Sequence, residues 1–196
     1  MKPIRLTVWS LKGGVGKTTI ALNLALHFNC AIITNERYTL LNKVLPSNKF
    51  LKLGVDQKVP IIDKKHSIIF DMGGYIDNRV ISSIKQSDYV IIPTSADKLD
   101  LQGCISTIQE IKSINNDIII VANRIETKDE YFRISNLIKK MGNYPVFPVR
   151  KSRIIKNLVD EKQSVHQISE QGGLKAYSLR SFIKQWDRII NFINKK

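Results

Sequence analysis

Lys12-Gly13-Gly14-Val15-Gly16-Lys17-Thr18-Thr19 stands between an apolar run over residues 4–9 and an amphipathic stretch that begins at Lys17. This order of strand, glycine-rich turn and helix is typical of a phosphate-binding loop, because glycines let several backbone N–H groups point at one centre. The helix then offers its unpaired first N–H groups and its positive dipole end to an anion. Lys17 is placed to reach the β and γ phosphates, and the Thr18 hydroxyl is placed to hold Mg²⁺. We therefore predict nucleotide binding rather than a glycine turn with solvated lysines.

The loop departs from the strict pattern at its front, where Leu11 replaces the expected glycine and a second lysine, Lys12, follows. These residues resemble the deviant Walker A loop of the ParA/MinD family of ATPases. In that family the front lysine crosses a dimer interface to the partner's phosphates, so the resemblance assigns that role to Lys12 and a catalytic role to Lys17 beside it. It implies ATP and Mg²⁺ as cofactors, with ATP held between two copies by the residues Gly13, Gly14, Val15, Gly16, Lys17, Thr18 and Thr19.

The composition bounds the class of protein. The chain has 196 residues, 43% hydrophobic and 24% charged, which suits one soluble domain that we expect to span residues 1–196. No apolar stretch approaches the ~20 residues of a membrane span, and the N-terminal run lacks a signal cleavage site, so a cytoplasmic protein is expected. Cys30 and Cys104 lie far apart in the sequence, which favours two reduced, buried thiols.

The charge balance points to a polyanionic partner. The chain holds 31 Lys and Arg against 17 Asp and Glu, a formal charge of +14. Such an excess creates a field that favours nucleic acid or an anionic membrane. Biased codon usage would account for many lysines, but it would not account for the shortage of acids.

Apolar runs rich in Ile and Val alternate with helical patterns along the chain, which is typical of βαβ units and a parallel sheet. We predict strands near residues 4–9, 30–34, 67–71, 89–93, 118–122 and 146–149, and residues 59–62 are a candidate for a short edge strand. We predict helices near residues 17–28, 76–86, 101–115, 129–141, 152–161 and 174–194, with a short helix and loop within 36–58. The expected fold is α/β, a single doubly wound, mostly parallel sheet flanked by helices, as in P-loop NTPases.

An aspartate ends the apolar run over residues 67–71 and is followed by Met72-Gly73-Gly74. Asp71 could simply begin a turn before the glycines. Because ligands bind at the carboxyl edge of parallel strands, we predict instead that Asp71 meets the metal held by Thr18, directly or through water. In the resembling family this segment is the second switch, which places the Gly74 N–H near the γ phosphate.

Two later segments also match the family in order. Residues 89–105 are similar to its strand, proline and Leu-Asp-Leu segment, in which we interpret Asp100 as a helix N-cap rather than a catalytic acid. Residues 118–124 end in Asn123-Arg124, where the family places its adenine contact. An Asn side chain suits a purine edge because it carries donors and an acceptor, and the alternative is a turn-forming Asn at a strand end.

One motif departs from the family. After the second strand the family usually carries Asp-x-Asp-Pro-Gln, whose aspartates position and activate the attacking water, whereas this chain reads Thr34-Asn35-Glu36-Arg37-Tyr38. Glu36 keeps a carboxylate at the second acidic position with one more methylene, and Thr34 removes the first. Because a displacement of about 1 Å can cost ~100-fold in rate, we predict slow intrinsic hydrolysis with Glu36 as the water-orienting group.

Basic residues crowd the last quarter of the chain, where the family forms a non-specific DNA surface across its ATP-bound dimer. The candidates are Arg150, Lys151, Arg153, Lys156, Lys175, Arg180, Lys184 and Arg188. Lysine and arginine suit this role because phosphate neutralisation releases counterions regardless of sequence. A solvated helix face is the alternative for any one of them.

The expected protein is thus a small ParA-type partition ATPase without an N-terminal DNA-binding domain. Its implied partners are a second copy, non-specific double-stranded DNA and a centromere-binding, ParB-like adaptor, and its implied location is the nucleoid. The rival is a MinD-like positioning ATPase whose C-terminal amphipathic helix meets a membrane. The apolar stripe of that helix also fits a core layer against the sheet, which is the interpretation we prefer.

Overall fold

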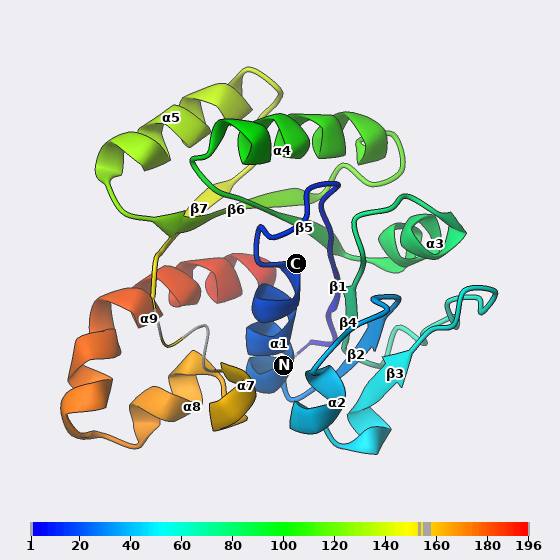
Figure 1. Ribbon diagram of the computed structural model, residues 1–196, viewed down its shortest axis with the longest axis horizontal. Coiled ribbons are helices and arrows are strands. Elements are labelled where there is room, and N and C mark those ends of the chain that lie inside the picture. The colour runs from blue at the N-terminus through cyan, green and yellow to red at the C-terminus, as the bar shows by residue number, and fades with distance from the viewer. Residues whose placement is uncertain (1, 153, 155–157, 196) are drawn as a thin grey trace.

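Seven strands form one sheet in the order β3-β2-β4-β1-β5-β6-β7, and every neighbouring pair is parallel. The computed structural model describes residues 2–152, 154 and 158–195 (Figure 1). The strands are β1 (Arg5–Val8), β2 (Ala31–Thr34), β3 (Phe50–Lys52), β4 (Ile68–Asp71), β5 (Tyr89–Thr94), β6 (Ile118–Ile125) and β7 (Val146–Arg150). The predicted parallel α/β fold of the P-loop NTPases is confirmed.

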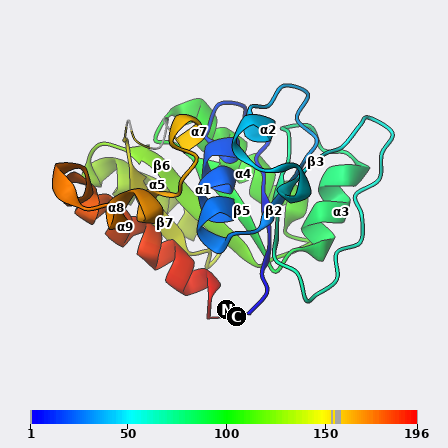
Figure 2. The same ribbon diagram turned by 90° about the horizontal axis from the view of Figure 1, so that it is seen from below.

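Helices cover both faces of the sheet, as Figures 1 and 2 show. One face carries α1 (Lys17–Phe28), α2 (Leu41–Val44), α7 (Leu158–Glu161), α8 (Val165–Glu170) and α9 (Gly173–Ile193). The other face carries α3 (Asn78–Gln86), α4 (Lys98–Ile111) and α5 (Lys128–Lys139). A short 3-10 turn, η1 (Ser47–Lys49), precedes the edge strand β3.

The inner strands are mostly apolar because their side chains alternate between two buried cores. Along β4, Ile69 packs in the core under α1 and α9, whereas Phe70 packs in the core under α3 and α4. Leu6 and Val8 face the first core, and Trp9 faces the second. Burying each such side chain contributes about 1.5–3 kcal/mol. The two layers hold β1, and the loop that follows it, at the middle of the sheet.

The edge of the sheet differs from the prediction. Residues 59–62 are not a strand, and the edge strand is instead β3, Phe50–Lys52, within the segment expected to be helix and loop. Pro60 lacks the N–H that a ladder needs. Helix α8 was not predicted. Within the predicted helix over 152–161, Ile154 and Leu158–Glu161 are helical, and residues 153 and 155–157 lie outside the described residues.

Aspartates begin two of the helices on the second face. The Asp77 carboxylate accepts from the backbone N–H groups of Arg79 and Val80, each at 2.9 Å, and Asp97 accepts from Leu99 N at 2.8 Å. Side-chain caps of this kind contribute about 1 kcal/mol. The interpretation of Asp100 as an N-cap is therefore wrong, because α4 begins one turn earlier at Asp97.

The last helix packs its apolar stripe against the sheet. Leu179, Phe182, Trp186, Ile189 and Ile193 are each no more than 1% exposed and belong to the first core. This is the core-layer arrangement that we preferred over a membrane anchor. None of the helices in the described part of the chain is long and apolar enough to cross a membrane.

Candidate functional site

The phosphate loop lies between β1 and α1 at the carboxyl edge of the sheet. Gly14 and Gly16 have φ angles of 79° and 100°, a region that residues with a Cβ rarely adopt. A Cβ on Gly16 would also lie 2.4 Å from the side-chain nitrogen of Asn123. Gly16 is thus required by both its backbone angle and the close approach of β6, and α1 begins at Lys17 with its first N–H groups at the loop.

Two residues of β6 hold the loop from outside. Asn123 Nδ2 donates to Val15 O at 2.9 Å, and Arg124 Nη2 donates to Gly14 O at 2.8 Å. Asn123 is buried. Arg124 has a φ of 60°, and its side chain points at the loop. The predicted adenine contact by Asn123 and Arg124 stays a prediction. The geometry adds a second role, in which both side chains fix the shape of the phosphate loop.

Lys17 is buried inside the loop that it serves. Its side-chain nitrogen donates to Lys12 O at 3.2 Å, and the residue is 7% exposed. Burial lowers the pKa of the Lys17 ammonium, while the negative charges of Glu36 and Asp71 act in the opposite direction. A buried cation with two acids nearby is placed to meet the charge of a phosphate.

Lys12 differs from Lys17, because its side chain is 40% exposed and leaves the loop toward α4. Its Nζ lies 3.9 Å from Asp100 Oδ1, a long and partly exposed ion pair. The Lys12 side chain crosses Gly103, where an added Cβ would lie 2.8 Å from Lys12 Cβ. Asp100 also accepts from the Ser95 hydroxyl at 2.6 Å. Lys12 therefore stands at the surface, while Lys17 is enclosed.

The predicted metal ligands occupy neighbouring positions. In the sheet register Asp71 pairs with both Val8 and Thr34. Asp71 is fully buried, and neither of its carboxylate oxygens has a hydrogen-bond partner within the described residues. Burial raises the pKa of Asp71 to about 7, and the adjacent Thr18 hydroxyl opposes that rise. A buried carboxylate beside a hydroxyl is an oxygen donor set that fits Mg²⁺.

The turn after β2 is joined to the turn after β4 by the side chain of Asn35, for which no role was predicted. Gly73 N donates to Asn35 Oδ1 at 2.7 Å, and Trp9 Nε1 donates to Gly73 O at 2.7 Å. Thr34 Oγ1 accepts from Glu36 N at 3.1 Å. A polar Asn directly after a buried strand is the signal that could have identified Asn35, because strand ends at this edge meet the ligand.

Glu36 and Gly74 both lie close to the turns that surround the phosphate loop. A Cβ on Gly73 would lie 3.4 Å from Glu36 Oε1, so the Glu36 carboxylate reaches the turn after β4. A Cβ on Gly74 would lie 2.9 Å from Leu11 O, so this turn packs directly against the front of the phosphate loop. The structure thus brings Lys17, Glu36 and Asp71 together, and the roles of these residues stay predictions.

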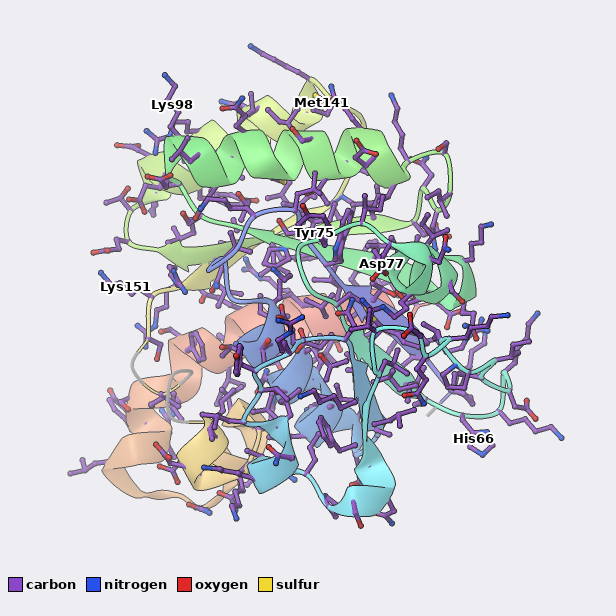
Figure 3. All side chains as sticks on the ribbon, turned by 45° about the vertical axis from the view of Figure 1, so that its right-hand side comes forward. His66, Tyr75, Asp77, Lys98, Met141 and Lys151 are labelled. Atoms are coloured by element: carbon purple, nitrogen blue, oxygen red, sulfur yellow. The ribbon has the colours of Figure 1, made fainter. Side chains whose placement is uncertain are left out.

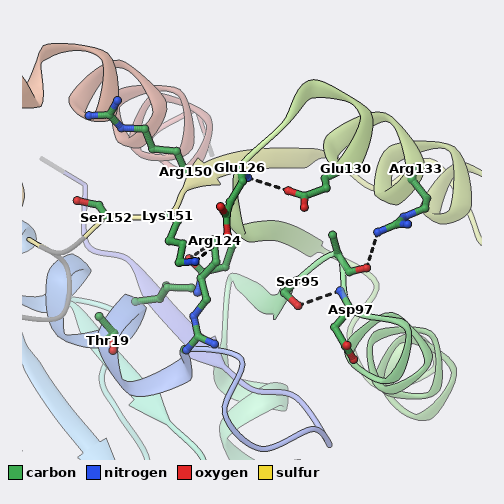
Figure 4. Close-up of a pocket in the computed structure, with 14 residues that line it drawn as sticks. Thr19, Ser95, Asp97, Arg124, Glu126, Glu130, Arg133, Arg150, Lys151 and Ser152 are labelled. Atoms are coloured by element: carbon green, nitrogen blue, oxygen red, sulfur yellow. Dashed lines mark hydrogen bonds and ion pairs between the residues drawn. The ribbon is translucent and has the colours of Figure 1, made fainter.

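A cleft of about 600 Å³ opens beside the loop (Figure 4). Its walls come from the phosphate loop and α1, from the end of β6, and from the starts of α4 and α5; they include Gly16, Thr19, Asn123, Arg124, Glu126, Arg150 and Lys151. Lys151 pairs with Glu126 at 2.7 Å on its rim. The cleft adjoins the loop at Gly16, and its volume suits the base and sugar of a nucleotide.

The structure divides the predicted DNA-binding residues into two groups. Arg150 and Lys151 line the cleft, and Arg150 is held by α9, with its Nη2 donating to Ser178 O at 3.1 Å. Arg180, Lys184 and Arg188 follow one another at helical spacing on the exposed side of α9, and Arg180 stacks on Tyr177 at 4.8 Å. Arg153, Lys156 and the side chain of Lys175 lie outside the described residues.

No family model matches the chain. The maintenance of carboxysome distribution protein A of Halothiobacillus neapolitanus is 25% identical over 215 aligned positions, covering 94% of this chain and 96% of that protein. The structure is also similar to that of a proposed plasmid partition protein from Borrelia burgdorferi B31 bound to AMPPNP. Their TM-score is 0.70 at 15% identity, with all of both chains covered.

A third likeness is to the septum site-determining protein MinD of Pyrococcus horikoshii, complexed with Mg-ADP. The TM-score is 0.66 at 14% identity, covering 95% of this chain and 96% of that chain. These likenesses confirm the resemblance to the ParA/MinD ATPases and their fold. The nucleotides in the two solved relatives show that this fold binds adenine nucleotides in those proteins.

Proposed function

We propose that this chain is a ParA-type ATPase that dimerises around Mg-ATP, binds non-specific duplex DNA as a dimer and releases it on hydrolysis. The observation that carries the proposal is the different placement of the two lysines of one loop. Lys17 is buried and serves its own site, whereas the Lys12 side chain is 40% exposed and points away from the loop, where a second copy could receive it. The related proteins include one that distributes carboxysomes and one proposed to partition plasmids.

The residues of the site supply the parts of a phosphate-transfer centre. The loop N–H groups and Lys17 would hold the phosphates, and Thr18 with Asp71 would hold Mg²⁺, which when bound neutralises phosphate charge. Glu36 would orient the attacking water. Asn35 accepts a hydrogen bond from Gly73 N, and this contact would hold the turn after β4 next to Glu36. Because Glu36 acts without a second acid, intrinsic hydrolysis is expected to be slow.

The basic row of α9 supplies the proposed DNA surface, made of Arg180, Lys184 and Arg188. One row of three cations binds weakly, and pairing two copies doubles the number of phosphate contacts. ATP thereby shifts the population toward a DNA-binding state by stabilising the dimer. In this proposal the cargo is plasmid or chromosomal DNA, the adaptor is a centromere-binding, ParB-like protein, and the ATP-bound dimer lies on the nucleoid.

Co-sedimentation with random duplex DNA, run with ATP, ADP and no nucleotide, tests the proposal. We expect wild-type protein to be retained best with ATP, and we expect Lys12→Ala and Lys17→Ala to lose the ATP-dependent part. Size-exclusion chromatography should show an ATP-dependent dimer that Lys12→Ala lacks. Retention that is the same with and without ATP would contradict the switch. A parallel run with anionic liposomes separates the MinD-like alternative, which requires ATP-dependent flotation.

A further inference from the structure

Positive charge gathers in a second segment, residues 37–66, which the sequence analysis did not connect with DNA. This segment holds seven basic residues, Arg37, Lys43, Lys49, Lys52, Lys58, Lys64 and Lys65, against two acids, Asp56 and Asp63. Residues 98–140, which include α4 and α5, hold the same number of basic residues against six acids. Residues 37–66 therefore carry a net excess of five basic residues, whereas the longer segment 98–140 carries an excess of one.

The loop that presents much of this charge is long and fixed. Residues 53–67 connect β3 to β4 with 15 residues and no helix or strand, a length that is uncommon in compact proteins unless the loop has a function. Arg79 Nη1 donates to Gly54 O at 2.8 Å, and Ile62 N donates to Gln86 Oε1 at 2.8 Å. Leu53 and Val59 are buried beneath the loop. Helix α3 therefore holds the loop at both ends, independently of the phosphate loop.

The lysines on this loop face solvent. Lys58, Lys64 and Lys65 are exposed, and no ion pair engages them in the part of the chain that the structure describes. The Asp63 carboxylate makes a hydrogen bond within its own turn, in which Oδ1 accepts from Lys65 N at 2.9 Å. Figure 3 shows side chains with nitrogen tips projecting from the loop around His66. Their charge is thus available to a partner.

Two further lysines extend the charge onto the edge of the sheet. Lys52 lies on β3, where its Nζ donates to Arg37 O at 2.6 Å, and Lys43 is exposed on α2. We define the edge surface as Lys43, Lys52, Lys58, Lys64 and Lys65. Because β3 and β7 are opposite edges of the sheet and α9 packs beside β7, the edge surface is separate from the basic row of α9.

We propose that the edge surface binds the phosphate backbone of duplex DNA and does so without nucleotide. Cations spread over a helix, a strand and a loop suit an extended polyanion better than one small ligand. The choice of DNA rests on the proposed function. The exposed Val55 and Ile61 beside these lysines would also suit an anionic lipid surface, so lipid is the competing outcome. Since α3 fixes the loop, we expect the loop lysines to be equally exposed to DNA with and without bound nucleotide.

The test compares two triple variants of equal charge change. Lys58→Gln/Lys64→Gln/Lys65→Gln removes the loop lysines, and Lys112→Gln/Lys139→Gln/Lys140→Gln removes exposed lysines at the ends of α4 and α5. Binding of labelled random duplex is measured by fluorescence anisotropy without nucleotide at several salt concentrations. For the loop variant we expect an affinity loss of about 10-fold or more, and a log–log salt slope shallower by about 2 to 3. For the control we expect a much smaller change.

Several outcomes would overturn the proposal. Equal losses in both triple variants would assign the effect to net charge, and an unchanged loop variant would remove the surface from DNA binding. Loss of binding to phosphatidylglycerol vesicles with intact DNA binding would assign the surface to lipid. Thermal unfolding checks that both variants are folded. The loop variant should keep the ATP-dependent gain in DNA retention. If the wild-type protein shows no such gain, the proposed ATP switch is rejected, and the proposal for the edge surface is not affected.

Discussion

The phosphate loop and the turn after β2 lie at the same edge of the sheet, yet they are stabilised in different ways. The loop is fixed from several directions, by Asn123 and Arg124 of β6 and by its own Lys17. The turn depends on the Thr34 hydroxyl and the Asn35 amide, both neutral groups. The difference teaches that nucleotide binding is built redundantly here, whereas the geometry for hydrolysis rests on few contacts. Substitutions at four residues would break or sharpen that contrast.

The largest effect is expected for Lys17→Ala. This change removes a buried cation that faces the phosphate position, and hydrogen bonds to charged groups contribute about 1.5–3 kcal/mol. We expect ATP affinity to fall by about 100-fold in isothermal titration calorimetry. The exposed Lys140→Ala serves as control and should bind ATP as wild type does. A Lys17→Ala protein that retains wild-type affinity would show that the loop alone suffices.

Glu36→Gln tests the geometry for hydrolysis at the turn after β2. It keeps the size of the side chain and removes the carboxylate that would orient water. Because a positioned acid or base contributes about 100-fold or more, single-turnover ATP hydrolysis should slow by about that factor, while ATP affinity changes little. Glu110→Gln on the exposed side of α4 is the control. An unchanged hydrolysis rate would exclude Glu36 from the reaction.

Asn35 connects the two turns, so its substitutions measure how few contacts hold the hydrolytic geometry. Asn35→Ala leaves the Gly73 N–H without its partner, and an unsatisfied donor costs about 1–3 kcal/mol. We expect that loss in the urea unfolding free energy. Asn35→Asp keeps an acceptor and should lose less. Equal losses in the two variants would show that the side chain acts by packing rather than by its hydrogen bond.

The last substitution tests a pH dependence of stability that Asp71 gives to the nucleotide-free protein. Its pKa is raised from 3.8 to about 7 by burial, so between those values the folded protein binds more protons than the unfolded chain. The unfolding free energy therefore falls as pH rises through this window and stays lowered above it. Asp71→Asn removes this loss and should raise Tm by roughly a few degrees at pH 8, with a much smaller rise at pH 5.

Thermal unfolding in buffers without Mg²⁺ or nucleotide measures this difference. The exposed Asp129→Asn is the control, and it should show no growing gain with pH. If the gain of Asp71→Asn were the same at pH 5 and pH 8, the buried charge would not be its cause.

Local pattern was enough for most of the fold. The Ile- and Val-rich runs identified six strands of the sheet, because a strand buried on both faces has to be apolar along its whole length. The edge strand β3 was missed for the converse reason. Its residues are partly exposed and include Lys52, so no buried pattern marks it, and the apolar residues 59–62 were mistaken for it. Asp100 was misinterpreted because Asp97 and Asp100 both suit a cap, and only the start of α4 distinguishes them.

By itself the sequence determined the phosphate loop, its two lysines and the parallel sheet, because glycine spacing and apolar periodicity act over short stretches of chain. Only the tertiary structure decided how the loop is held, since Asn123 lies 108 residues from its acceptor Val15. It also decided that Asn35 meets Gly73, that Lys12 is exposed while Lys17 is buried, and that residues 53–67 present lysines at the sheet edge. These features depend on which strands become neighbours, and parallel pairing brings together residues that are distant in sequence.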